Sequence, residues 1–465
     1  MNIVFKRALG AAAFAAALYF PYFLHLDAPV LRLWDESRLA CNALDQHQNG
    51  FGLVVRFEGK PDLWNTKPPL MIWLQAGCMR ILGANELAVR LPAAAAGLGT
   101  SLLLFFALKG RTGAAAALIL ATMPGWVGHH GARTGDYDAL LVFASTGFLL
   151  HFYRFLETKR RRALWTAAAF AATGLMTKGA ALALCVPGAA LAALAIRPRV
   201  FRNAELYLAA ATAFVPLTVY YLAREAQDPG YLQAVWNNEW GGRYFSTIEG
   251  HDHPWYFYFE QMFGRRLGLW KFALVFGILA FGRNPKLARY LWTASLTYLA
   301  LVGGSQTKLA WYDLPVYPLW AALTALGWAA ISSAKAKWAL AAGLIVPAYF
   351  YVVSKVYHPK ERPEDENLYA LPRLMRQSKH LEYIAVGEHR QLIAFYAQLK
   401  NIEYRTPTDD FEIGEKIMFS ENNSREQIRR RYEISVERED KGVQFGEILE
   451  EVEKYNASKN KVIKK

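Results

Sequence analysis

Groups of acidic, basic and aromatic residues recur in this sequence where apolar segments end. The stretch "LWDESR" contains Asp35, Glu36 and Arg38, and "WNTKPPL" contains Lys67. Three later stretches have the same character: "HHGARTGDYDALL", "NNEWGGRYFSTIEGHDHPWYFY" and "SQTKLAWYDLPVYP". A carboxylate can orient a hydroxyl group or take its proton, and a cation can stabilise negative charge that develops on a phosphate. Any one stretch also fits an ordinary interfacial belt of Trp, Tyr, Lys and Arg, but five on one side favour a functional site.

The elements that must position these residues are long apolar segments. The chain has 465 residues, of which 54% are hydrophobic and 20% are charged. Several segments have the roughly 17–22 apolar residues that one bilayer crossing needs, and shorter ones can span within a bundle. The eleven candidate spans are 9–26, 87–108, 114–128, 139–156, 163–176, 179–196, 206–222, 269–282, 288–303, 314–331 and 338–353. The sequence therefore predicts an all-α polytopic membrane protein with about 11 transmembrane helices.

The distribution of charge predicts how the chain is oriented. Lys and Arg are concentrated in alternate short loops, which predicts a cytoplasmic N-terminus and places the five polar stretches outside. The first span lacks a small-x-small cleavage pattern, so we expect it to be retained. Acidic and basic residues nearly balance after Lys355, so the membrane half carries the net charge of +14. That excess fits topology and contact with anionic lipids rather than nucleic-acid binding. Three cysteines predict no disulfide framework.

The composition changes near residues 357–363, which predicts two domains. Residues 1–355 would form the membrane domain, and residues 356–465 a small soluble extracytoplasmic α/β domain, with "YIAVG" as a strand and "RQLIAFYAQL" as a helix. Two outer loops, at about 27–86 and 224–266, are longer than a connection requires, and such loops usually carry function. In the first, "PPLMIWLQAGCMRIL" predicts a helix that lies in the membrane interface.

A site with these groups at the outer membrane surface suits glycosyl transfer from a polyprenyl-phosphate sugar. The lipid of such a donor lies in the bilayer, and its sugar lies at the interface. Its phosphate is a good leaving group that needs cations rather than a strong acid. The acceptor needs orientation and, if it is a hydroxyl, a carboxylate base. A second carboxylate would stabilise an oxocarbenium-like transition state.

The same residues carry a resemblance to a known family. The motifs "DESRLA", "NTKPPLMIWLQA", "ELAVRLPAA", "ARTGDYDALL", "LMTKGA" and "TKLAWYDLPVYP" occur in the order seen in GT-C glycosyltransferases of the protein O-mannosyltransferase and aminoarabinose-transferase (ArnT-like) clan. The resemblance covers roughly residues 1–330. It implies that Asp35 is the essential carboxylate, with Asp138, or its rival Asp136, in support. It also implies phosphate contacts from the following residues: Arg38, Lys67, Lys308 and Tyr312.

One motif departs from that family. ArnT-like members often read Phe-Glu-Lys-Pro where this chain reads Asn65-Thr66-Lys67-Pro68, and the resemblance implies a metal contact for that Glu. Its absence puts an aminoarabinose substrate and a metal site in doubt. His251 and His253 are candidates for ligands of a divalent metal, and no other cofactor is implied.

The sequence thus predicts a membrane glycosyltransferase that moves a sugar, with inversion, to a lipid, glycan or protein acceptor outside a bacterial plasma membrane. Its partners would be the polyprenyl-phosphate donor, the acceptor and membrane lipids. Glu36 and Arg133 are further candidates for binding the substrate, whereas His129 and His130 are more typical of boundary residues. A transporter or flippase of lipid-linked sugars is the alternative. It would place charges at the bilayer midplane and show repeat symmetry, neither of which the sequence indicates.

Overall fold

The structure is a computed structural model that describes residues 3–247, 250–357, 366–377, 384–386, 390–406, 408–419, 422–440 and 443–452. The chain divides into two compact units. Residues 1–26 and 46–358 form the helical unit, and residues 27–45 and 359–465 form the sheet unit. The start of the first long loop therefore groups with the C-terminal residues. That the sheet unit is extracytoplasmic stays a prediction.

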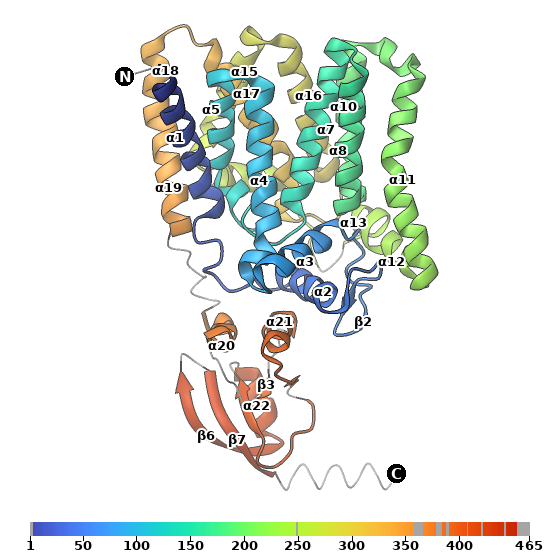
Figure 1. Cartoon of the computed structure of the whole chain (residues 1–465), viewed down its shortest axis with the longest axis vertical. Helices are drawn as coiled ribbons and strands as arrows, with labels where there is room; N and C mark the ends of the chain where they lie inside the picture. Colours follow the sequence, from blue (N-terminus) through green and yellow to red (C-terminus); the bar gives the residue numbers. More distant parts are fainter. Residues whose placement is uncertain are drawn as a thin grey trace. The chain divides into compact units, whose positions relative to one another are not determined.

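Each of the eleven predicted spans contains a helix within the described residues. These helices are α1 (Ile3–Phe23), α4 (Glu86–Leu108), α5 (Gly110–Ala121), α7 (Asp138–Thr158), α8 (Arg161–Lys178), α10 (Val186–Ile196), α11 (Ala204–Gln227), α15 (Leu274–Arg283), α16 (Pro285–Gly303), α17 (Tyr317–Ala330) and α19 (Val346–Tyr357). They lie side by side as a bundle (Figure 1). The fold class predicted from hydropathy is confirmed.

Four of the described helical segments are long and apolar enough to cross a bilayer on length and composition alone. They are α4, α7, α11 and the continuous stretch Ala334–Tyr357, which joins α18 (Ala334–Leu340), η6 (Ala341–Ile345) and α19. On α11, Leu208, Val215 and Val219 each remain more than half exposed. Such a row of exposed apolar side chains fits a lipid-facing surface. The total of eleven crossings stays a prediction.

Small residues let the elements of this unit approach closely, as Gly97 of α4 does with the turn at Ala132 and Gly327 of α17 does with α15. A Cβ added at Gly97 of α4 would lie 2.6 Å from the Cβ of Ala132, and one added at Gly327 of α17 would lie 1.6 Å from the carbonyl oxygen of Phe276 in α15. Neither distance is possible for real atoms, so only glycine fits. Helices in membranes pack through small residues in this way because apolar burial gives little drive there.

Short elements occupy the two long loops of the sequence. The first contains α2 (Asp35–Asn49), a hairpin of β1 (Arg56–Phe57) and β2 (Lys60–Pro61), and α3 (Leu70–Leu82), which is the helix predicted there. The second contains α12 (Tyr231–Val235), the π-helical turn η2 (Trp236–Trp240), α13 (Gly242–Phe245), α14 (Phe257–Gln261) and the π-helical turn η3 (Met262–Arg266). In the helical unit, α3, α12 and α13 gather at one end of the bundle (Figure 1).

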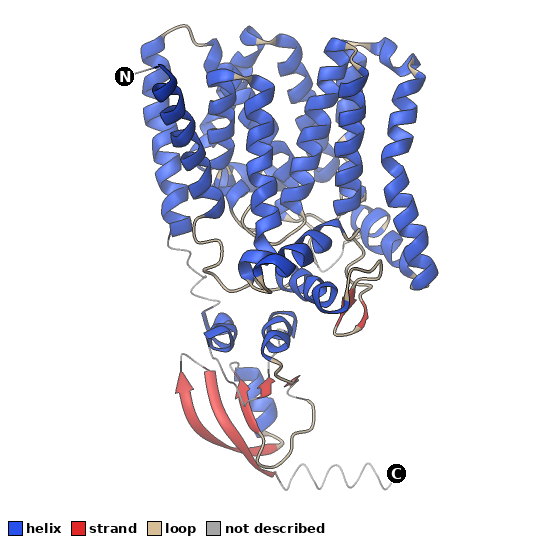
Figure 2. Ribbon diagram, viewed as in Figure 1, coloured by secondary structure: helices blue, strands red, loops and turns tan. Residues whose placement is uncertain are grey.

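The sheet unit has an α/β arrangement, as predicted. Its strands are β3 (Ile384–Val386), β4 (Tyr404–Arg405), β5 (Lys416–Phe419), β6 (Tyr432–Asp440) and β7 (Val443–Glu451), in the order β4-β3-β5-β7-β6. The pairs of β3 with β4 and β5 are parallel, and the others are antiparallel. The helices are α20 (Glu366–Gln377), α21 (Arg390–Lys400) and α22 (Asn422–Arg429). Apart from the β1–β2 hairpin, the strands of the described chain lie in this unit (Figure 2). The predicted strand "YIAVG" and the predicted helix "RQLIAFYAQL" correspond to β3 and α21.

Hydrogen bonds tie the first-loop segment 27–45 to the helices of the sheet unit. The Leu31 N–H donates to the Tyr396 hydroxyl at 2.9 Å, and the Cys41 thiol donates to the Gln391 carbonyl at 3.3 Å. Arg376 of α20 donates to the Ala28 carbonyl at 2.8 Å. The segment that carries Asp35 is therefore held by α20 and α21, which belong to the last quarter of the sequence.

Candidate active site

The connection from α6 (Pro124–Val127) to α7 carries the first part of the candidate site. The Ala132 N–H donates to the Trp126 carbonyl at 2.7 Å, which closes a tight turn. His130 in this turn has a φ of 57°, a left-handed conformation that non-glycine residues seldom adopt. Gln75 of α3 donates to the Gly135 carbonyl at 2.8 Å. These contacts fix the backbone immediately before Asp136 and Asp138.

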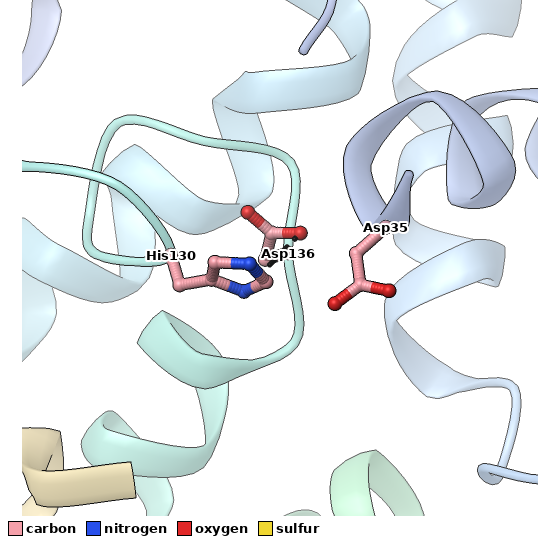
Figure 3. Close-up of side chains that lie close together, drawn as sticks. All are labelled: Asp35, His130 and Asp136. Carbon is pink, nitrogen blue, oxygen red and sulfur yellow. Dashed lines mark ion pairs between the residues drawn. The ribbon is translucent and has the colours of Figure 1, made fainter. Parts of the chain in front are cut away.

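A buried charge cluster forms at the start of α7. The Nδ1 atom of His130 lies 3.6 Å from a carboxylate oxygen of Asp136 and 3.6 Å from one of Asp138. The Lys178 ammonium at the end of α8 lies 2.6 Å from the other oxygen of Asp138. Figure 3 shows the imidazole of His130 beside the carboxylate of Asp136, with their ion pair marked. All four side chains are at most 8% exposed. Charges this deeply buried are costly unless they are paired, which is what the cluster provides.

Aromatic residues of η5 (Ala310–Val316) cover this cluster. The Trp311 ring stacks on the His130 ring with centroids 3.6 Å apart and planes 5° from parallel. Next to it, the Lys178 ammonium lies 5.2 Å from the centre of the Tyr312 ring, within range of a cation–π interaction. An aromatic face beside paired charges keeps water away from them, which strengthens their interaction.

The same turn of η5 is anchored by a buried ion pair. Arg266 donates to both carboxylate oxygens of Asp313, at 2.9 and 3.0 Å. The Tyr317 hydroxyl also donates to Asp313, at 3.1 Å. Two parallel bonds from one guanidinium define a geometry more tightly than a single contact does. This arrangement fixes the turn that presents Trp311 and Tyr312.

The stretch that precedes α3 forms the second part of the candidate site. Asn65 and Thr66 are fully buried, and the Tyr137 hydroxyl donates to the Asn65 side-chain oxygen at 2.9 Å. The Tyr231 hydroxyl donates to the Thr66 carbonyl at 2.7 Å. The next residue, Lys67, keeps its ammonium 3.3 Å from Glu239 of η2 and 5.7 Å from the centre of the Tyr137 ring. Residues of the second long loop, Tyr231 and Glu239, thus hold Lys67 and its neighbour Thr66 of the first loop in place.

The structure brings several predicted residues of the helical unit together and separates others. Asp136 and Asp138 meet at His130, and Tyr312 reaches the same cluster through Lys178. Lys67 lies in the second group, which adjoins the first because Tyr137 directly precedes Asp138.

Arg133 and Lys308 have contacts elsewhere in the helical unit. Arg133 donates to the carbonyls of Pro21 and Leu24 at the end of α1, at 3.2 and 2.6 Å. Lys308 donates to the Ser305 carbonyl at 2.5 Å. Burial lowers the pKa of the Lys308 ammonium, and the nearby charge of Asp252 opposes that shift.

The predicted residues at the start of the first loop, Asp35, Glu36 and Arg38, belong to the sheet unit. Asp35 is the first residue of α2, where a carboxylate is favoured by the helix dipole. Glu36 is 1% exposed, and one of its oxygens accepts the Arg32 N–H at 2.7 Å. That bond gives Glu36 a local structural role, whereas Asp35 and Arg38 remain partly exposed.

The two histidines that the sequence offered as metal ligands have other surroundings. The His253 ring stacks on Phe257 with centroids 4.1 Å apart, and the His251 carbonyl accepts the Lys308 N–H at 2.9 Å. Among the described residues of the helical unit, neither histidine belongs to a group of three potential ligands. His130 and Asp136 are of types that bind divalent metals, and they could contribute to such a site, whereas the Lys178 ammonium already occupies one oxygen of Asp138.

Sequence reasoning missed the partners of the predicted residues. His130 read as a boundary residue, yet its imidazole lies between two carboxylates. The motif "LMTKGA" contains Lys178, and the structure pairs its ammonium with Asp138. Glu239 and Trp311 carried no local signal beyond an aromatic-rich, polar stretch. Only the pairing of distant segments reveals them.

Comparisons with known proteins agree with this fold and with the sequence resemblance. A family described as dolichyl-phosphate-mannose-protein mannosyltransferase matches residues 66–221, which include Lys67, the charge cluster and Lys178. The crystal structure of ArnT from Cupriavidus metallidurans bound to undecaprenyl phosphate is similar, with a TM-score of 0.74 and 16% identity over 94% of this chain and 97% of that one. The archaeal oligosaccharyltransferase AglB from Archaeoglobus fulgidus, in complex with an inhibitory peptide and a dolichol-phosphate, has a TM-score of 0.54 and 12% identity over 90% of this chain and 70% of that one.

These likenesses define the class of protein: a multi-pass membrane protein with the GT-C fold, as the resemblance to the ArnT and protein O-mannosyltransferase clan predicted. Among curated proteins, "Putative mannosyltransferase YycA" of Bacillus subtilis (strain 168) is 33% identical over 113 residues. That match covers 23% of this chain and only 16% of the relative.

Proposed function

We propose that this protein is a glycosyltransferase that moves a sugar from a polyprenyl-phosphate donor to an acceptor at the outer face of a bacterial plasma membrane, with inversion. The acceptor is a lipid, a glycan or a protein. The N-terminus lies in the cytoplasm, and the sheet unit lies outside.

The observation that carries this proposal is the buried cluster at the start of α7. Asp136, Asp138, His130 and Lys178 combine two carboxylates with an ammonium and an imidazole at one end of the helix bundle. Glycosyl transfer from a lipid phosphate needs carboxylates for the sugar and acceptor and cations for the phosphate, at the depth where the lipid head lies. The fold supports the same reaction class, because the similar structures were solved with undecaprenyl phosphate and dolichol-phosphate.

Each candidate residue receives a role in this proposal. Asp35 acts as the essential carboxylate, which orients the acceptor or takes its proton, and Asp138 assists, with Asp136 beside it. Tyr312, whose ring lies beside the Lys178 ammonium, and three candidate cations contact the phosphate. The cations are Arg38, Lys67 and Lys308.

Arg133 and Glu36 have supporting roles. Two N–H groups of the Arg133 guanidinium donate to backbone carbonyls at the end of α1. We therefore assign Arg133 to positioning the turn before Asp136 rather than to direct contact with the sugar. Glu36 supports the start of α2 through its bond to the Arg32 N–H.

Mass spectrometry of lipids and cell-surface glycans, with and without the gene, tests the reaction. We expect one defined sugar to disappear from one class of molecule when the gene is deleted and to return with the wild-type gene. Asp35→Asn should fail to restore it although the protein is inserted normally. Asp27→Asn is the matched control, because Asp27 is an exposed carboxylate of the same loop. Full restoration by Asp35→Asn would refute its assigned role. Accumulation of an unmodified donor on the inner face would instead favour a flippase.

A further inference from the structure

Lys67 and Glu239 form an ion pair that joins the two long loops. The Lys67 ammonium lies 3.3 Å from the Oε1 atom of Glu239. The Thr66 hydroxyl donates to the same oxygen at 2.9 Å. Two consecutive residues of the first loop, one charged and one neutral, thus contact the same oxygen of Glu239.

The two sides of this pair differ in how firmly they are held. The segment beside Lys67 is anchored by two hydrogen bonds. The Asn65 side-chain oxygen accepts the Tyr137 hydroxyl, and the Thr66 carbonyl accepts the Tyr231 hydroxyl. Glu239 lies in the short π-helical turn η2, a single turn of a rare helix type. A change of partner at Lys67 therefore requires movement of the Glu239 side chain rather than of Lys67.

The pair is also accessible. The Lys67 side chain is 17% exposed and that of Glu239 is 12% exposed, whereas the Lys178–Asp138 pair has values of 8% and 5%. An anion approaching from the solvent can thus reach Lys67. A phosphate that binds there competes directly with the Glu239 carboxylate for one ammonium.

We propose that Glu239 is a built-in competitor of the lipid phosphate for Lys67 and thereby sets the affinity of this site for phosphate. The inference rests on the proposed function, in which Lys67 contacts that phosphate. When the phosphate binds Lys67, the Thr66 hydroxyl still donates to Glu239, so the displaced carboxylate keeps a partner. The acid beside Lys67 thus comes from the second loop.

This competition has a use in the reaction. The donor phosphodiester carries one negative charge, and the phosphate monoester left after transfer carries up to two near neutral pH, because its second pKa is about 6. A cation with no competitor would hold the more highly charged product more tightly than the donor. Glu239 competes with both ligands and weakens the hold on each, so the product, which would otherwise be held more tightly, is released faster.

Equilibrium binding of radiolabelled undecaprenyl phosphate to the full-length protein in lipid nanodiscs tests the inference. Glu239→Gln removes the charge but keeps a group that can bond with Thr66. We expect it to lower the Kd by about fivefold, the upper range for a partly exposed ion pair. Glu260→Gln is the matched control, because Glu260 is an exposed carboxylate of the same loop, and it should leave the Kd unchanged.

If Glu239 acts by competing for Lys67, its effect on the Kd must disappear when Lys67 is removed. A double variant tests this requirement. Lys67→Gln should raise the Kd, and adding Glu239→Gln to it should change nothing further. An unchanged or higher Kd in Glu239→Gln alone would overturn the inference while leaving the proposed function intact. Failure of the wild-type protein to bind undecaprenyl phosphate would overturn both, and it would be seen before any variant is compared.

Discussion

Tyr396→Phe should lower the rate of sugar transfer although Tyr396 belongs to the C-terminal part of the sequence. The Tyr396 hydroxyl accepts the Leu31 N–H at 2.9 Å, and Tyr396 is only 2% exposed. Leu31 lies four residues before Asp35, in the segment that α20 and α21 hold. Removal of the hydroxyl leaves the buried Leu31 N–H without this acceptor, so the segment loses one of its anchors.

The magnitude follows from the cost of a buried hydrogen-bonding group. An unsatisfied N–H in such a place costs about 1–3 kcal/mol. If the segment 27–45 shifts so that the Leu31 N–H finds another acceptor, Asp35 moves away from the position in which it acts on the acceptor. If the shifted arrangement is favoured by only about 1.4 kcal/mol, a tenth of the molecules remain competent. We therefore expect kcat to fall about tenfold, and the donor KM to rise as well, because Arg38, to which we assign a phosphate contact, lies in the same segment as Asp35.

A matched variant separates this effect from simple destabilisation. Tyr432 is 1% exposed, and its hydroxyl accepts the Phe411 N–H at 3.1 Å within the same sheet unit. Tyr432→Phe should cost similar stability in thermal unfolding but leave kcat close to that of the wild type. Steady-state transfer in proteoliposomes measures both variants. If both lower kcat equally, or neither does, the reasoning that α21 positions the Asp35 segment is wrong.

Three further predictions concern the helical unit. Asp138→Asn should lower the free energy of unfolding by about 3–5 kcal/mol because it leaves the Lys178 ammonium buried without its carboxylate. The combined change Asp138→Leu with Lys178→Met should recover much of that loss, as measured by a thermal-shift assay in detergent. Trp311→Leu should reduce transfer by roughly threefold to tenfold through loss of the stack on His130, whereas Trp311→Phe should retain most activity in the same kinetic assay. Because burial lowers the pKa of the Lys308 ammonium, this group loses its proton at a lower pH than an exposed lysine does, so phosphate affinity should decline as the pH rises on the alkaline side. Lys308→Arg should therefore move the alkaline limb of the activity–pH profile upward.

The bundle was predictable from sequence because hydropathy acts on each segment separately. A long apolar segment such as α4 or α7 forms a helix in a membrane, since a helix satisfies its backbone hydrogen bonds within the one segment. The small C-terminal strands and helices also followed from local patterns, as β3 and α21 illustrate. The grouping of residues 27–45 with the C-terminal helices had no such signal. It depends on contacts such as that of Leu31 with Tyr396, across 365 positions.

The candidate site shows the same division. Asp138 and Lys67 could be chosen from sequence because charged residues at the ends of apolar segments are costly and thus informative. Their partners could not be chosen, because Lys178 and Glu239 lie 40 and more than 170 positions away in the chain. No local pattern encodes which carboxylate meets which ammonium. The packing of α7 on α8 decides the first pair, and the path of the second long loop decides the other.

The two ion pairs suit different tasks in the proposed reaction because they differ in burial. Separating Lys178 from Asp138 would leave two charges deep in the protein, at a cost of several kcal/mol, so this pair cannot open for each turnover without losing much of the binding energy. Separating Lys67 from Glu239 costs far less, because both side chains retain access to water and Glu239 keeps the Thr66 hydroxyl. Lys178 is therefore suited to fix Asp138 in place, and Lys67 is suited to exchange one anion for another as the lipid phosphate enters and leaves.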